Sequence, residues 1–104
     1  MTERVKVKGV ALTTDLSSDN AIPYFLWSQP MTIAELRRRL GGSEEERDHL
    51  LGTILREARE PDVWMFTTPE EVAARWSRLE RYLGRKREFW EFLLGEWRKL
   101  GLMN

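Results

Sequence analysis

His49 is the one imidazole in the chain, and it follows an acidic run whose last member is Asp48. An imidazole with carboxylates at helical spacing can bind a divalent cation. His49, however, lies outside the apolar positions of this segment, such as Leu50 and Ile54. We therefore interpret the run as the solvated, acidic start of a helix, and we expect neither a metal site nor a cofactor.

Covalent catalysis has little support in the residue types. The chain contains no cysteine, and no serine between glycines resembles a nucleophile elbow. The segment Gly41-Gly42-Ser43 could offer backbone N–H groups to an anion, but it lacks the lysine of a phosphate-binding loop. We therefore expect a protein that is not an enzyme. The enzyme alternative requires a pocket that encloses His49 or a carboxylate with a shifted pKa.

Basic side chains cluster in two places, at Arg37, Arg38 and Arg39 and again at Arg85, Lys86 and Arg87. The first cluster falls in the last turn of a predicted helix, where the helix dipole favours positive charge. The second opens a predicted helix, where the dipole opposes positive charge by on the order of 0.3 kcal/mol. The unfavourable placement of this second basic cluster indicates that it has a function, such as contact with an acidic partner or a phosphate group. Solvated charge is the alternative interpretation.

Aromatic residues are frequent, with five Trp, four Phe and two Tyr among 104 residues. Trp76, Trp90 and Trp97 recur at helical spacing, which favours packing in a core. Other aromatic residues fit no single buried face: Tyr24, Phe25, Trp27 and Phe92. Large aromatic side chains outside a core are typical of protein interfaces, because they bury much area at little entropic cost. We therefore predict that these positions and the basic clusters bind a partner protein. For residues 24–27, the first interpretation is an apolar plug that packs its aromatic side chains onto the helices, and a partner-binding strip is the alternative.

Four helices must position these residues. Hydroxyl caps predict helix starts at Thr32, Ser43 and Thr68. The predicted helices cover about residues 33–40, 44–59, 69–83 and 85–100, and glycine or proline ends the first three. The last helix carries one wide apolar face, made of Phe89, Trp90, Leu93, Leu94, Trp97 and Leu100.

The segments outside these helices have other patterns. Alternation from Arg4 to Lys8 predicts a short strand that Val10 to Leu12 could extend, and a Ser/Thr/Asp-rich loop follows. Pro23 and Pro30 each restrict the preceding residue to extended geometry, which argues against a helix of any length between them. We therefore interpret the aromatic segment as extended. Residues 62–67 also alternate, which predicts a short strand or an extended crossing.

Composition narrows the class of protein. The 17 basic and 17 acidic residues balance, which removes the simplest argument for nucleic-acid binding. No apolar run approaches the roughly 20 residues that span a bilayer, so we expect a cytoplasmic protein without membrane contact. The predicted fold is all-α. A bundle of four main helices occupies residues 31–104, and an extended arm occupies residues 1–30.

A DNA-binding regulator of helix-turn-helix or winged-helix type is the main alternative function. Residues 33–40, the Gly41-Gly42 turn and the following helix have the outline of a helix-turn-helix. The recognition helix would begin with Glu44, Glu45 and Glu46, which phosphate groups repel. Nucleic acid is therefore the less favoured partner.

Several segments together carry a family resemblance: Tyr24-Phe25-Leu26-Trp27, Ile54 to Arg59, Asp62-Val63-Trp64, Thr68 to Val72, Trp76 and Phe89 to Leu94. Over about residues 22–102 the chain is similar to small bacterial proteins that are often encoded beside nucleotidyltransferase toxins of the AbiE class. The resemblance implies an antitoxin or accessory protein that binds such a toxin and blocks its site. In the mechanism it suggests, exposed aromatic residues anchor the contact and the arginines meet an acidic, metal-binding cleft.

Overall fold

Hydroxyl side chains start three of the helices, as the sequence predicts. In this computed structural model, which describes residues 4–7 and 10–102, Thr32 Oγ1 caps α1 (Ile33–Leu40) and accepts the Glu35 N–H at 3.2 Å. Ser43 caps α2 (Glu44–Glu57) and Thr68 caps α4 (Pro69–Ala74), each by accepting the N–H three residues later at 3.1 Å. Each cap satisfies a backbone donor that has no partner inside its own helix.

Two compact units make up the chain, residues 1–47 and residues 48–104, and the division falls inside α2. The sequence predicts a boundary at residue 30. In the structure this position lies inside the first unit, between α1 and the segment before it. In the structure, backbone bonds tie α1 to that segment. The Ile33 N–H donates to the Ala21 carbonyl at 2.9 Å, and the Ala34 N–H donates to the Asp19 carbonyl at 3.0 Å. The first helix therefore belongs with the N-terminal part of the chain.

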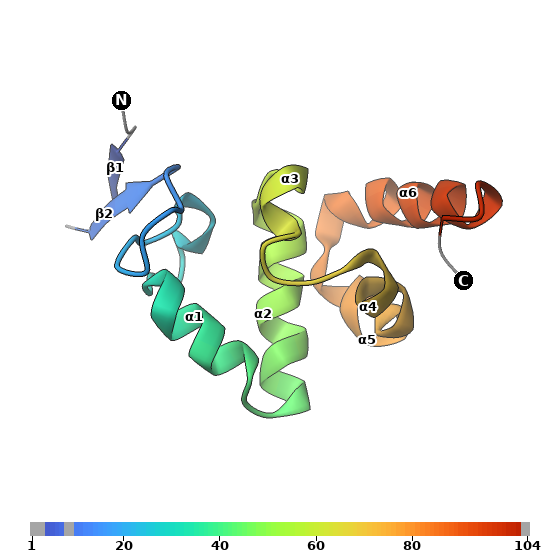
Figure 1. Cartoon of the computed structure of the whole chain (residues 1–104), viewed down its shortest axis with the longest axis horizontal. Helices are drawn as coiled ribbons and strands as arrows, with labels where there is room; N and C mark the ends of the chain where they lie inside the picture. Colours follow the sequence, from blue (N-terminus) through green and yellow to red (C-terminus); the bar gives the residue numbers. More distant parts are fainter. Residues whose placement is uncertain (1–3, 8–9, 103–104) are drawn as a thin grey trace. The chain divides into compact units, whose positions relative to one another are not determined.

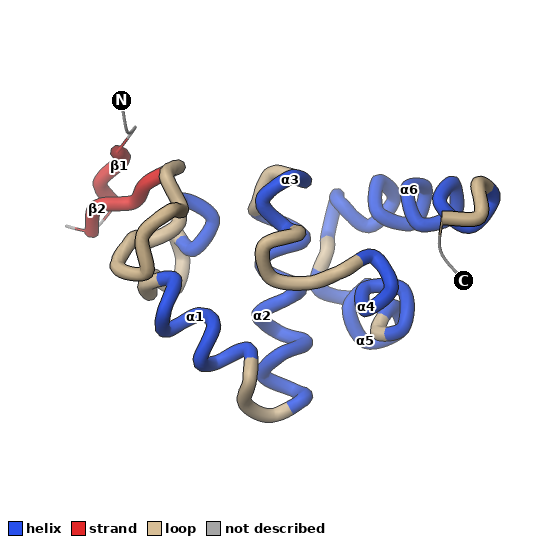
Figure 2. The backbone as a smooth tube through the Cα atoms, viewed as in Figure 1, coloured by secondary structure: helices blue, strands red, loops and turns tan. Residues whose placement is uncertain are grey.

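The first unit opens with a β-hairpin, which Figures 1 and 2 show at the N-terminal end. Its strands are β1 (Arg4–Val7) and β2 (Val10–Thr13), and they pair antiparallel with Arg4 opposite Thr13. The predicted strand therefore folds back on itself instead of continuing from residue 4 to residue 12. Lys8 and Gly9, which belong to that prediction, lie outside the described residues.

The aromatic segment after the hairpin forms a 3₁₀ turn, so the prediction of an extended segment is wrong. The turn η1 (Tyr24–Leu26) follows Pro23, whose carbonyl accepts the Leu26 N–H at 3.1 Å. It buries the consecutive side chains of Phe25 and Leu26, which a strand would direct to opposite faces. Pro23 is compatible with this turn because it precedes the turn and supplies only a carbonyl.

The second unit contains the rest of α2 and a series of mostly short elements: α3 (Glu60–Val63), α4, α5 (Trp76–Leu79), the 3₁₀ turns η2 (Glu80–Tyr82) and η3 (Gly84–Lys86), and α6 (Arg87–Lys99). Its buried apolar side chains are Leu50, Leu51, Ile54, Leu55, Ala58, Val63, Phe66, Val72, Leu79, Leu83, Trp90 and Leu94. The apolar positions that the sequence indicates in α2, Leu50 and Ile54, are both buried. Trp90 joins α6 to α2, because its Nε1–H donates to the Leu55 carbonyl at 2.9 Å.

The predicted helix over residues 69–83 is broken in the structure. The backbone leaves helical geometry at Arg75, where φ is −97° and ψ is 6°, and α5 and η2 follow. The break directs the Arg75 side chain to two carboxylates, those of Asp48 at 2.7 Å and Glu71 at 3.0 Å. A long-range ion pair, which local periodicity does not encode, therefore accompanies the interruption.

Residues 62–67 form helix and turn, so the predicted strand is wrong. Pro61 lies in the first turn of α3, where a missing N–H costs nothing, and it starts this short helix. Val63 and Phe66 are both buried, and the Phe66 N–H donates to the Val63 carbonyl at 3.0 Å. Two buried residues that are three positions apart fit a turn, whereas in a strand the side chains on one face are two positions apart. The fold is nevertheless all-α as predicted, with one hairpin as the sheet of the described residues.

Candidate protein-docking surface

The outer face of α6 exposes large apolar side chains. Phe89 is 45% exposed, Phe92 65% and Leu100, just after the helix, 70%. Together with half-buried Leu93 they share one side of a helix with 3.6 residues per turn, and we call these four residues the outer face of α6. The sequence places Phe89 and Leu100 on one wide apolar face with Trp90, and the structure buries Trp90 but exposes the other two. The apolar arc of α6 is wider than the side of the helix that packs inside the unit.

An aromatic cluster lies beneath this face. The ring centroid of Trp64 lies 5.7 Å from those of Trp90 and Trp97, and the Phe89 centroid lies 5.1 Å from that of Trp90. Trp90 is buried, and the Trp64 Nε1–H donates to the Glu60 carboxylate. Rings that are held in this way form a rigid base for the outer face. Rigid aromatic anchors are typical of the residues that dominate binding energy at interfaces.

The predicted basic cluster at residues 85–87 leads directly into α6. Arg85, Lys86 and Arg87 are all exposed, and Arg87 pairs with the Glu80 carboxylate at 2.9 Å. Among the described residues, Arg85 and Lys86 take part in no ion pair. Both stand at the positive end of the α6 dipole. A carboxylate from outside the chain would therefore be attracted by two side-chain charges and by the helix end; we call Arg85 and Lys86 the basic end of α6.

The other basic cluster, on α1, is partly neutralised within its own helix. The Glu35 carboxylate accepts hydrogen bonds from Arg38 at 2.5 Å and from Arg39 at 2.8 Å. These bonds, first that of Arg38 and then that of Arg39, hold the pKa of Glu35 below its ordinary value. Arg37 is exposed beside them. This cluster therefore presents less net charge to a partner than its three arginines suggest.

The predicted contacts at residues 24–27 do not form one surface. Phe25 is 1% exposed and belongs to the core, so its predicted contact with a partner is wrong. Tyr24 is half-buried, with its ring centroid 5.2 Å from that of Phe25. Trp27 is 50% exposed and is the candidate contact that this segment retains. The 3₁₀ turn separates these side chains, which an extended reading of the sequence does not reveal.

A buried ion network occupies part of the acidic run around His49. Asp48 is 5% exposed, and its carboxylate accepts hydrogen bonds from Arg75 at 2.7 Å and from Arg78 at 2.8 Å. The interpretation of this run as solvated is therefore wrong for Asp48, whereas His49 is exposed as expected. Sequence reasoning missed the network because the arginines lie 27 and 30 residues away. Its complementary charges indicate a structural role.

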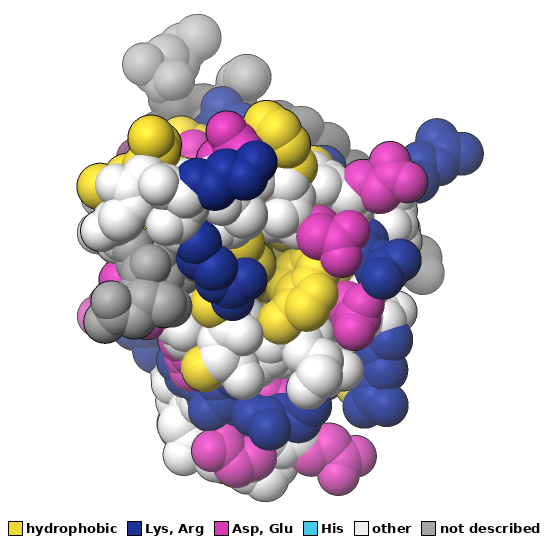
Figure 3. Space-filling model, turned by 90° about the vertical axis from the view of Figure 1, so that its right-hand side faces the viewer, with side chains coloured by type: hydrophobic (Ala, Val, Ile, Leu, Met, Phe, Trp, Pro, Cys, Tyr) yellow, Lys and Arg dark blue, Asp and Glu magenta, His cyan; other side chains and the backbone are white. Residues whose placement is uncertain are grey.

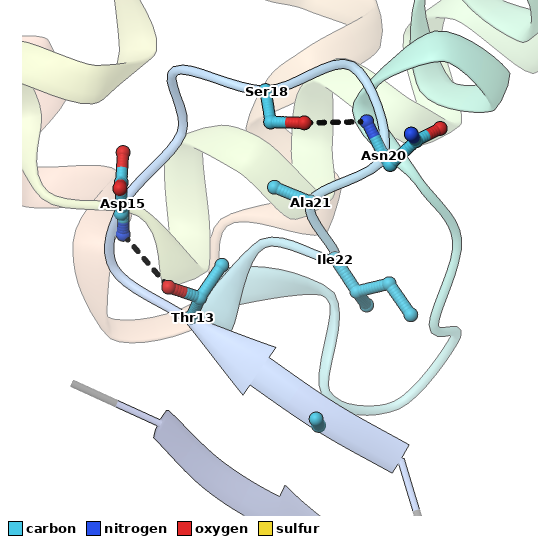
Figure 4. A pocket seen from close by; sticks show the side chains of 7 residues that line it. Thr13, Asp15, Ser18, Asn20, Ala21 and Ile22 are labelled. Atoms are coloured by element: carbon cyan, nitrogen blue, oxygen red, sulfur yellow. Dashed lines mark hydrogen bonds between the residues drawn. The ribbon is translucent and has the colours of Figure 1, made fainter. Parts of the chain in front are cut away.

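A hollow of about 360 Å³ lies beside β2 and the loop that follows it, lined by Ala11, Thr13, Asp15, Ser18, Asn20, Ala21 and Ile22 (Figure 4). Two of its polar side chains are engaged in turns of the loop. The Asp15 N–H donates to Thr13 Oγ1 at 3.0 Å, and the Asn20 N–H donates to Ser18 Oγ at 3.2 Å. These bonds stabilise the loop, and they give the hollow a structural explanation.

The charges visible on the surface bear on nucleic-acid binding. Figure 3 shows one face of the molecule, on which exposed hydrophobic side chains lie between basic and acidic ones. Both signs are interspersed on this face, whereas surfaces that bind nucleic acid are typically basic. The first turn of α2 exposes Glu44 and Glu45, which a DNA backbone would repel. These features disfavour the helix-turn-helix alternative.

Residues 4–7 and 10–102 contain no group of three or more His, Cys, Asp or Glu side chains placed to hold a metal ion. In the same part of the chain, no helix combines the length and the apolar composition needed to cross a membrane. Comparisons with protein families, with curated proteins and with solved structures give no match for this chain.

Proposed function

We propose that this chain is a non-catalytic protein-interaction module that docks a partner on the outer face of α6 and on its basic end. The observation that carries the proposal is the exposure of Phe92, at 65%, on the same side of α6 as Phe89, with Leu100 also exposed just after the helix. Single exposed apolar residues are normal on protein surfaces, but an apolar face on one element is typical of a binding site.

Energetics favour a partner on this face. Fully burying one large apolar side chain is worth about 1.5–3 kcal/mol, and the outer face offers several such side chains to water. Their aromatic base is already ordered by the Trp64, Trp90 and Trp97 contacts. Less conformational entropy is therefore lost when a partner covers Phe89 than when it covers a mobile side chain.

The family resemblance supports a more specific form of the proposal. In it, the partner is a nucleotidyltransferase toxin of the AbiE class, and this chain acts as its antitoxin or accessory protein by occluding its site. The basic end of α6, and secondarily Arg37 to Arg39, would meet acidic groups of the partner. This form rests on the resemblance, whereas the docking face rests on side-chain exposure.

A comparative pull-down tests the proposal. The tagged chain is incubated with nuclease-treated lysate of its source cells, alongside the Phe92→Ser variant and the control Met65→Ser, which removes an exposed apolar residue outside α6. We expect one stoichiometric protein partner, lost with Phe92→Ser and retained with Met65→Ser. Equal recovery by wild type and Phe92→Ser would contradict the proposal. Nucleic acid recovered without any protein from an untreated control lysate would favour the DNA-binding alternative.

Mass spectrometry of the recovered partner then tests the specific form. A nucleotidyltransferase would support the antitoxin or accessory role, and an activity assay with and without the chain would separate inhibition from assistance. A partner of another class would contradict that form and leave the docking face in place.

A further inference from the structure

The outer face of α6 has the spacing that a second helix can follow. Phe89 and then Phe92 with Leu93 occur at successive turns of α6, Glu96 occupies the next turn, and Leu100 follows just after the helix. An element lying along α6 can therefore contact the apolar side chains in sequence. A partner helix with the same three- and four-residue spacing matches this arrangement, because ridges of one helix fit grooves of the other.

Gly95 adds a notch next to Phe92, at the edge of the outer face. It lies three residues after Phe92, and a Cβ added to it meets no atom within 4 Å. Glycine inside a helix is less favourable than alanine, so local stability does not account for it. Glycine does permit the close approach of another backbone. The notch therefore fits an element that packs tightly along α6.

The charges at the two ends of α6 restrict the occupant further. Arg85 and Lys86 precede the helix, and its last turn carries Arg98 and Lys99 against Glu96, which pairs with Lys99 at 3.2 Å. Both ends are therefore net basic. The C-terminal carbonyls are also satisfied within the chain, since the Leu102 N–H donates to the Trp97 carbonyl at 3.0 Å.

A second copy of this chain is a poor occupant in the parallel orientation. A parallel α6 pair would place Arg85 and Lys86 against the same residues of the other copy, and like charges disfavour association.

We infer that the partner presents an amphipathic helix to the outer face of α6, with carboxylates at the end that meets Arg85 and Lys86. This inference rests on the proposed function and adds to it the shape and charge of the partner's docking element. Each carboxylate would be attracted by two cations that take part in no ion pair among the described residues, and by the positive end of the α6 dipole.

A displayed library of helical peptides tests the inference. All members carry one apolar stripe, and the charged positions at each end are randomised between acidic, neutral and basic residues. Selection uses the full-length chain. We expect enrichment of acidic residues at one end, and about tenfold weaker binding of the selected peptides by the double variant Arg85→Glu, Lys86→Glu.

Two further variants report on the rest of the face. Phe92→Ser is expected to weaken the same peptides about tenfold, and so is Gly95→Leu, which fills the notch. The matched control Glu70→Lys changes a charge on α4 and is expected to leave peptide affinity unchanged. Circular dichroism of each variant confirms that the helices are retained.

The outcomes separate this inference from the proposed function. Selected peptides without an acidic bias, or with a basic one, would overturn the inferred charge. Peptides that bind the Phe92→Ser variant as tightly as wild type would overturn the inference that a helix occupies the outer face of α6. The pull-down with Phe92→Ser would still test separately whether a partner docks on this face. A dimer in sedimentation equilibrium that Phe92→Ser abolishes would overturn the inference in favour of a second copy.

Discussion

Proteins usually bury apolar side chains and expose charged ones, and two regions of the second unit do the reverse. Its interior buries a charged group, whereas the outer face of α6 exposes apolar ones. The interior holds a carboxylate, Asp48, at 5% exposure, whereas the outer face holds Phe92 at 65%. The buried charge is satisfied by Arg75 and Arg78. In the described residues nothing comparable covers the exposed ring. A buried polar group with partners inside the chain explains stability, whereas an apolar face without a cover indicates function.

The largest contrast is expected between two aromatic residues of α6. Trp90→Ala removes a buried indole and its bond to the Leu55 carbonyl, and should lower the free energy of unfolding by about 3–5 kcal/mol. Phe92→Ala removes an exposed ring and should change it by less than about 0.5 kcal/mol. Urea unfolding followed by circular dichroism measures both. A similar loss in the two variants would mean that the outer face is part of the core.

The buried carboxylate provides the next largest effect. Asp48→Ala leaves Arg75, 13% exposed, without one of its two carboxylate partners, and should cost about 2–3 kcal/mol of unfolding free energy. Arg78→Ala should cost less than about 1 kcal/mol, because that side chain is 54% exposed and Asp48 keeps its bond to Arg75. Denaturant titration of both variants tests the order. Equal losses would show that the network is not organised around Asp48.

Gly52 and Gly95 show the same contrast between a packed interior and an open helix surface. Gly52→Ala places a Cβ 2.5 Å from that of Tyr82, and should destabilise the chain by about 1–3 kcal/mol. Gly95→Ala meets open space inside a helix, and should stabilise it by up to about 1 kcal/mol. Thermal melts of the two variants should therefore shift in opposite directions. A lower melting temperature for Gly95→Ala would mean that the notch on α6 is filled.

The smallest effect is expected at an exposed ion pair. Hydrogen bonds from Arg38 and Arg39 lower the pKa of Glu35, so the folded state favours its carboxylate form. The associated stability is present above the ordinary pKa of 4.5 and is lost as the pH falls through the lowered value. Glu35→Gln should therefore reduce stability slightly at neutral pH and make it less sensitive to acid below pH 4.5. Melting curves of wild type and variant at several pH values check the sign, and an unchanged acid response would contradict it.

Local signals predicted much of this fold. The hydroxyls of Thr32, Ser43 and Thr68 cap their helices as expected, since capping depends on residues three positions apart. The break at Arg75 was not predictable in this way. It accompanies a bond to Asp48, 27 residues earlier in the chain. Long-range pairing of this kind leaves no periodic trace in the sequence.

The candidate site was predicted in part. The sequence singles out Phe92 because it lies off the stripe of its helix, and the structure places that residue on the surface. It places Phe89 and Leu100 on a wide apolar face, which does not reveal how much of its width the rest of the chain covers. It interprets residues 24–27 as extended, which does not reveal the 3₁₀ turn that buries Phe25.

Photo-crosslinking from the outer face of α6 is the most direct test of the docking surface. A photoreactive phenylalanine analogue is placed at position 92 in one variant and at position 70, exposed on α4, in another, and both are irradiated in the source cells. We predict one discrete protein adduct from position 92 and none from position 70. The same adducts from both positions, or none from position 92 while the pull-down recovers a partner, would contradict docking on α6.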